Sequence, residues 1–251
     1  MKSLLKGGSF MMENKLNEIS VAQAVAEIQE NIAQVCASCG RSEDSVTLMA
    51  VTKTVPPDRV NEAIDAGITF LGENRAQELL SKYDAYQKEN VQIHFIGHLQ
   101  SNKVRQIIDK VTMIQSLDSL SLAGEIQRQC EKHNKEMDCL VEVNIGSELT
   151  KSGVEPEQLE DFIQQAAQFS RLHIQGIMAI PPVCGSQLEL ERNFSRLHQL
   201  FIDIRAKNVD NVAMKILSMG MSGDYMTAIK HGSTMVRLGT VLFGRRAYGN
   251  P

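Results

Sequence analysis

Short runs of β-branched and apolar residues alternate with amphipathic segments from residue 46 onward, and this alternation repeats eight times. Apolar runs of about four to eight residues predict strands, and apolar residues that recur every three to four positions predict helices. The predicted strands are Val46–Lys53, Thr69–Asn74, Gln92–His98, Thr112–Asp118, Cys139–Ile145, Ile174–Pro181, Lys215–Ser222 and Thr234–Gly239. The predicted helices between them are Asp58–Ala66, Arg75–Glu89, Asn102–Asp109, Leu120–Asn134, Pro156–Ser170, Leu188–Lys207 and Asp224–His231.

Alternating strands and helices require parallel strands, and eight such units predict an α/β protein closed into a (β/α)8 barrel of the TIM type. An open Rossmann-type sheet is the alternative. The first predicted strand ends in the segment Lys53-Thr54-Val55-Pro56-Pro57. A dinucleotide-binding sheet would carry a GxGxxG turn at this point, and this segment does not contain one, which argues against the Rossmann-type sheet. The segment Asn17–Cys39 predicts one additional N-terminal helix. We therefore expect a single barrel domain over residues 17–251, preceded by a disordered leader over residues 1–16.

Composition narrows the functional classes. The chain has 251 residues, which matches the length of one barrel, and its 26 basic and 30 acidic residues are scattered, which argues against a nucleic-acid partner. No apolar run is long enough for a membrane span, and Lys6-Gly7-Gly8 interrupts the only apolar stretch of the leader, so we expect a cytoplasmic protein. Five cysteines are an odd number and predict reduced thiols; Cys36 and Cys39 are interpreted as the end of a helix rather than a redox or zinc site.

Lys53 ends the first predicted strand, at the carboxyl end where barrels carry their sites. The two-residue period of a strand places it on the same face as Met49 and Val51. An ammonium in an apolar barrel mouth has a depressed pKa and supplies the neutral amine that forms Schiff bases. Taken alone, Lys53 is better explained as a lysine that reaches solvent or pairs with Glu73.

The loop from Ser218 to Gly223 contains Met221 and Ser222 and is rich in glycine and serine, as anion-binding loops are. Gly239 and Thr240 end the eighth predicted strand and open the last segment, which supplies a second set of backbone N–H groups. Barrels often bind phosphate with the loops after strands seven and eight. The alternative is that these glycines only permit tight turns.

Arg237 shares a strand face with Gly239 and is predicted to point into the barrel. Because strand eight of a closed barrel neighbours strand one, Arg237 and Lys53 are expected in one cavity. An arginine against a pyridine nitrogen would keep that nitrogen unprotonated. The alternative is a structural ion pair of Arg237 with Glu73 or Glu142.

Seven segments together resemble, in order, the pyridoxal phosphate homeostasis protein family. They are AVTK (50–53), FLGEN (70–74), HFIGHLQSNK (94–103), KSG (151–153), GIMAIP (176–181), LSMGMS (217–222) and GSTMVRLGT (232–240). The resemblance covers residues 46–248. Thr52 and Arg75 depart from it, since serine and tyrosine are common there, and so does Gly223.

The resemblance implies a fold-type III barrel similar to the N-terminal domain of alanine racemase, with pyridoxal 5′-phosphate as the cofactor. It also implies site residues. They are Lys53 as the Schiff-base lysine, Ser222, Gly239 and Thr240 at the phosphate, Arg237 at the pyridine nitrogen, and Asn74 and Met178 as pocket walls; Ser218 and Met221 belong to the phosphate loop.

The family is regarded as non-catalytic, with a role in vitamin B6 and amino-acid balance. Racemases of this fold type need a second domain with an opposing acid–base residue, and the chain ends about a dozen residues after the eighth predicted strand, so we expect a cofactor carrier. We also expect a monomer and no bound metal. Apo-enzymes that use the cofactor are the expected partners. Two alternatives stay open: a residual amino-acid racemase, and a barrel aldolase that forms a Schiff base with a phosphorylated sugar.

Overall fold

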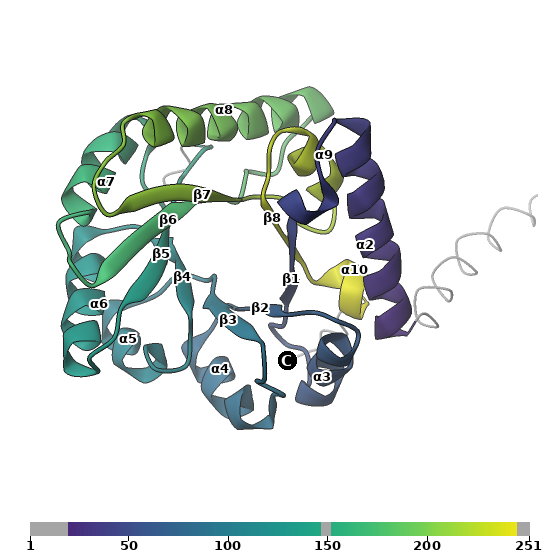
Figure 1. Ribbon diagram of the computed structural model, residues 1–251, viewed down its shortest axis with the longest axis horizontal. Helices are drawn as coiled ribbons and strands as arrows, with labels where there is room; N and C mark the ends of the chain where they lie inside the picture. Colours follow the sequence, from purple (N-terminus) through teal and green to yellow (C-terminus); the bar gives the residue numbers. More distant parts are fainter. Residues whose placement is uncertain (1–19, 147–151, 245–251) are drawn as a thin grey trace, which may run out of the picture.

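The structure, a computed structural model, describes residues 20–146 and 152–244. Its centre is a ring of parallel strands (Figure 1). The strands are β1 (Thr47–Val51), β2 (Phe70–Glu73), β3 (Gln92–Phe95), β4 (Met113–Leu117), β5 (Met137–Glu142), β6 (Leu172–Met178), β7 (Val212–Ser218) and β8 (Met235–Leu238). Each strand pairs with the next, and β8 pairs with β1. This closure confirms the predicted (β/α)8 barrel and excludes the open Rossmann-type sheet.

Helices form a layer around the ring (Figure 1). They are α2 (Val21–Ser38), α3 (Pro57–Asp65), α4 (Ala76–Lys82), α5 (Ser101–Ile107), α6 (Leu120–Lys132), α7 (Leu159–Ala166), α8 (Gln187–Ala206), α9 (Tyr225–Lys230) and α10 (Thr240–Phe243); short 3₁₀ turns cover Glu43–Ser45, Tyr83–Ala85 and Pro156–Gln158. The apolar side of each long helix faces the strands, and its polar side faces solvent, as the spacing predicted.

The additional N-terminal helix is α2, which packs beside α3, α9 and α10 (Figure 1). It begins at Val21 because Ser20 is extended and its side chain accepts a hydrogen bond from the Gln23 N–H, while the Gln23 side chain accepts from the Ser20 N–H. This reciprocal pair is a capping box. The predicted leader over residues 1–16, and residues 17–19 of the predicted helix, lie outside the described residues.

Several strands end earlier than the apolar pattern predicted. The runs continue to Ile145, Pro181 and Ser222, but β5, β6 and β7 end at Glu142, Met178 and Ser218. The residues that follow, such as Ala179 and Met219, are fully buried although they have left the strand. Because residues that follow a strand can also be buried, the apolar run in the sequence is longer than the strand itself.

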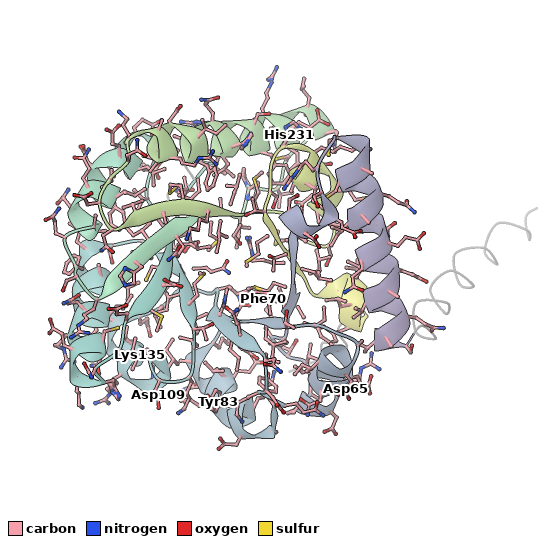
Figure 2. All side chains as sticks on the ribbon, viewed as in Figure 1. Asp65, Phe70, Tyr83, Asp109, Lys135 and His231 are labelled. Atoms are coloured by element: carbon pink, nitrogen blue, oxygen red, sulfur yellow. The ribbon has the colours of Figure 1, made fainter. Side chains whose placement is uncertain are left out.

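Side chains fill the centre of the barrel, where the ribbon alone leaves an open ring (Figure 2). One interior cluster joins Met49, Val51, Ile96 and Met235. Where β6 meets β7, Gly176 has φ +152° and a Cβ there would lie 1.8 Å from the Ile216 carbonyl oxygen. Only glycine allows this close contact between two strands.

Candidate cofactor site

The site predicted from the sequence lies at the carboxyl ends of the strands. Parallel strands bring all of these ends to one face of the barrel. Met178 and Ser218 are the last residues of β6 and β7, and Arg237 is on β8. Lys53 and Asn74 follow β1 and β2 by one or two positions, so that residues far apart in sequence share one mouth.

Arg237 is the only arginine or lysine that is buried among the described residues, with 3% of its surface exposed. Its Nη1 donates to Ser218 Oγ at 2.7 Å, and its Nη2 donates to the carbonyl oxygen of Ala179 at 2.9 Å. Burial lowers the pKa of the guanidinium to about 10, while the nearby carboxylates of Glu142 and Asp224 act in the opposite direction. The group therefore carries its charge at neutral pH, inside the barrel, in a fixed orientation.

Lys53 lies in the turn after β1 and is half-buried. On β1, Met49 is the register partner of Arg237. Met49 and Val51 face the barrel interior, whereas Thr52 turns outward and its Oγ1 donates to Glu73 Oε1 at 2.7 Å. Lys53 is the next residue along the chain, two positions after the interior-facing Val51. The predicted face of the strand is thus confirmed for Met49 and Val51, and Lys53 follows them at the mouth.

The two carboxylates considered as partners of Arg237 have different surroundings. Glu73 is buried, and it accepts hydrogen bonds from Thr52 and from the Tyr86 hydroxyl. Burial raises the pKa of Glu73 and, even more, that of Tyr86. Glu142 is electrostatically coupled to Arg237, and burial likewise raises its pKa. Within the described part of the chain, however, neither carboxylate forms an ion pair with Arg237 at 4 Å or less.

The loops after β7 and β8 meet at Ser222. Its Oγ accepts from the backbone N–H groups of Gly239 and Val241, each at 3.4 Å. Gly220 has φ +97°, and a Cβ there would lie 2.6 Å from the Ala228 Cβ, so glycine lets the loop pack against α9. The two loops predicted to bind phosphate therefore lie against each other, and phosphate binding by them stays a prediction.

The remaining predicted site residues differ in exposure. Met221 is exposed, and its N–H donates to Asp224 Oδ1 at 2.6 Å. Gly239 is the buried N-cap of α10, and Thr240 is its exposed first residue. Met178 is fully buried and packs against Met113 and Leu140.

Asn74 carries an unsatisfied polar atom. Its Oδ1 is buried and has no hydrogen-bond partner among the described residues. A buried acceptor without a partner costs about 1–3 kcal/mol, so such an atom is a candidate for a ligand contact.

This donor set fits pyridoxal phosphate. Backbone N–H groups and the Ser222 hydroxyl suit a phosphate, a fixed guanidinium suits the pyridine nitrogen, and the unsatisfied Asn74 acceptor suits a polar ring substituent. A lysine at the same mouth supplies an amine for an aldehyde.

Sequence reasoning missed one interior polar residue, Gln115. Gln115 on β4 is fully buried, and its Oε1 accepts from Ser218 Oγ at 2.8 Å. Its Nε2 lies 2.9 Å from Nδ1 of His94, which is buried as well. A glutamine inside the apolar run MIQSL was the signal for this contact.

A family model for the N-terminal domain of alanine racemase matches residues 24–247. A pyridoxal phosphate homeostasis protein from Aquifex aeolicus is 40% identical over 230 residues, covering 92% of this chain and 100% of that protein. This chain belongs to that family. Another member, from Escherichia coli K12, is 36% identical and covers 91% of this chain and 97% of its own length.

Solved structures agree with the family. PipY from Synechococcus elongatus, solved with pyridoxal phosphate bound, is 30% identical with a TM-score of 0.74, covering 85% of this chain and 100% of PipY. An unknown protein from Bifidobacterium adolescentis has a TM-score of 0.85 at 33% identity, covering 89% and 94% of the two chains. Alanine racemase from Corynebacterium glutamicum, at 15% identity and a TM-score of 0.66, covers 91% of this chain but only 62% of its own length, and it shares the fold.

No helix in the described ranges is both long and apolar enough to cross a membrane. Within residues 20–146 and 152–244, no group of three or more His, Cys, Asp or Glu side chains is arranged to hold a metal ion. Cys36 is buried at the end of α2, and Cys39, which follows that helix, is exposed.

Proposed function

We propose that this chain binds pyridoxal 5′-phosphate as a Schiff base on Lys53 and acts, without turnover, in vitamin B6 and amino-acid homeostasis. The observation that carries the proposal is the buried, doubly anchored Arg237 at the mouth of a barrel whose relatives include a protein solved with pyridoxal phosphate. Schiff-base formation joins Lys53 Nζ to the cofactor aldehyde and releases water.

Each predicted residue has a role in this proposal. Ser222, Gly239 and Thr240 bind the phosphate, with Ser218 at the start of the same loop and Met221 next to Ser222. Arg237 faces the pyridine nitrogen, and Asn74 and Met178 form walls. The support is that backbone N–H groups converge on Ser222 and that the Asn74 Oδ1 atom has no partner among the described residues.

Two features favour a carrier over a racemase. A guanidinium donates but cannot accept a proton, so it keeps the pyridine nitrogen unprotonated and the ring a weak electron sink. Racemisation also needs a second acid–base group, commonly a tyrosine, opposite the lysine. Tyr86 is engaged by Glu73 outside the barrel, and Tyr225 is buried and lies within hydrogen-bonding reach of Asn31 on α2.

We further propose that the protein acts as a cytoplasmic monomer that passes the cofactor to apo-enzymes. The relatives named for pyridoxal phosphate homeostasis support a role in cofactor supply rather than in one reaction. Transfer is tested by mixing the loaded protein with an apo-aminotransferase in the presence of a phosphatase that destroys free cofactor. Recovery of aminotransferase activity supports direct transfer, and its absence contradicts it.

The Schiff base is tested by loading the purified protein with pyridoxal phosphate, reducing it with borohydride and mapping the modified peptide. We expect the label on Lys53 and none in Lys53→Ala. Lys135→Met is the matched control, because burial lowers the pKa of Lys135, which precedes β5 at the opposite end of the strands. A label on another lysine, or none, contradicts the proposal.

Activity assays separate the two alternatives. A racemase predicts exchange of the α-proton of alanine or serine above the rate with free cofactor. An aldolase predicts that borohydride traps Lys53 only when a phosphorylated sugar is added. We expect neither result.

A further inference from the structure

A hydrogen-bonded network of buried polar side chains crosses the barrel interior. It runs from His94 on β3 through Gln115 on β4 and Ser218 on β7 to Arg237 on β8. The three contacts between them measure 2.9, 2.8 and 2.7 Å. Their exposed fractions are 1%, 0%, 0% and 3%, so water does not compete for these hydrogen bonds. Sequence positions 94 and 237 are thereby connected without a backbone contact between their strands.

The orientation of the Gln115 amide, with Nε2 toward His94 and Oε1 toward Ser218, sets the direction of the hydrogen bonds in this network. Arg237 has N–H donors and no acceptor, so Ser218 Oγ must accept from it. The single proton of Ser218 then goes to Gln115 Oε1, which leaves the Gln115 amide N–H to donate toward His94. With the Gln115 amide in this orientation, His94 Nδ1 accepts, so the imidazole is neutral with its proton on Nε2, an atom that has no hydrogen-bond partner among the described residues.

The arrangement also fixes the plane of the guanidinium. Nη1 is held by Ser218 and Nη2 by the Ala179 carbonyl, which come from two different strand ends. The Gln115 amide is itself held from a second side by the Met235 sulfur at 3.2 Å. Removing the acceptor at Gln115 would leave the Ser218 hydroxyl free to rotate and would loosen one of the two anchors of Arg237.

We propose that Gln115 and His94 are positioning residues of the cofactor site, which hold Arg237 through Ser218 in the orientation that meets the pyridine nitrogen. Neither residue touches the cofactor in this proposal. It rests on the proposed function, because the pyridine nitrogen is the group that Arg237 would meet.

The test uses the full-length protein loaded with pyridoxal phosphate that carries ¹⁵N in the ring. Gln115→Met keeps the volume of the side chain and removes both polar ends. We expect the ring ¹⁵N resonance to shift and the dissociation constant for pyridoxal phosphate to rise about tenfold, which corresponds to about 1.4 kcal/mol. The resonance reports the hydrogen bond at the nitrogen, which a loss of general stability would not move.

A matched control and a conservative pair accompany this variant. Gln129→Met removes another buried glutamine, on α6 in the outer layer, and should leave both readouts unchanged. His94→Leu removes the acceptor and should shift both readouts in the direction of Gln115→Met. His94→Asn should restore most of what His94→Leu loses, because the asparagine Oδ1 can accept from Gln115.

The outcomes are decisive in each case. If Gln115→Met and His94→Leu keep the wild-type ¹⁵N resonance and affinity, the inference is overturned while a labelled Lys53 leaves the proposed function standing. If borohydride labels no Lys53 in the wild type, the proposed function fails and the inference fails with it. If Gln115→Met does not fold, the comparison of His94→Leu with His94→Asn decides: a difference between them supports the inference, and identical readouts overturn it.

Discussion

His94 should make the free energy of unfolding depend on pH in a way that one substitution removes. Its imidazole is inside the barrel, packed edge-on against the Phe70 ring at 5.6 Å between centroids, and hydrogen-bonded to Gln115. Burial lowers the pKa of His94 to about 4, from about 6.5 in an unfolded chain. His94→Asn keeps an acceptor for Gln115 and removes the titrating group.

The sign follows from proton binding. Between about pH 4 and pH 6.5 the unfolded chain binds a proton at residue 94 and the native protein does not, so stability rises with pH in this window. The contribution of His94 is fully present above pH 6.5 and is lost as the pH falls toward 4. The difference between the two pKa values corresponds to about 3 kcal/mol of unfolding free energy.

Urea denaturation of the apo-protein at several pH values between about 4 and 7.5 measures this effect. The buried carboxyls of Glu73, Glu142 and Asp224 have raised pKa values and change stability in the opposite direction, but they are present in both proteins and cancel in the difference. On acidification from about pH 7.5 to pH 4, the unfolding free energy of wild type should fall by about 3 kcal/mol more than that of His94→Asn. Parallel curves for the two proteins would refute the reasoning.

Three further predictions concern stability. Gly176→Ala should lower the unfolding free energy by about 3 kcal/mol or more, because its Cβ would overlap the Ile216 carbonyl; a urea midpoint equal to that of Gly185→Ala would contradict this. Ser20→Ala should cost about 1 kcal/mol by removing the capping box of α2, and an unchanged urea midpoint would be inconsistent with that cap. Hydrogen bonds to Glu136 and Asn211 raise the pKa of His173 in the folded protein. The stability that His173 contributes is therefore present below its unfolded pKa and is lost as the pH rises through its folded pKa. His173→Gln should lose less unfolding free energy than wild type between about pH 6 and pH 8, and an equal loss would argue against this linkage.

The fold could be predicted from sequence because each strand is a short apolar run bounded by a helical pattern, and eight such units leave the barrel as the simplest closure. Strand ends were less predictable. Residues such as Ala179 and Met219 belong to the main hydrophobic core although they follow the ends of their strands, and no local pattern separates this burial from burial within a strand. The sequence also predicted that Arg237 points inward, because alternation along β8 needs no knowledge of the other strands.

The interior contacts could not be predicted, because they depend on register between strands far apart in sequence. Nothing near Ser218 indicates that its hydroxyl meets Gln115, which is 103 positions away. Glu73 is a second example of a contact that the sequence does not predict. Its position at the end of a strand suggested that its side chain lies at the barrel mouth, but the side chain turns outward and accepts hydrogen bonds from Thr52 and Tyr86. A strand end leaves two faces to choose from, and only the pairing of β2 with its neighbours decides between them.

A buried guanidinium is costly in a barrel otherwise filled by methionine, leucine and isoleucine. The serine, glutamine and histidine that connect to Arg237 offset this cost, yet replacing all four by apolar residues would avoid it altogether. Asn74, at the same mouth, adds an acceptor that nothing in the described chain satisfies. Polar groups that an apolar core would not need are best explained by the free energy they contribute when a charged, planar ligand binds. On this reasoning, the quadruple variant Arg237→Met, Ser218→Ala, Gln115→Met and His94→Leu should raise the thermal stability of the apo-protein while abolishing the extra stability that pyridoxal phosphate confers, and a variant that is less stable in both states would contradict it.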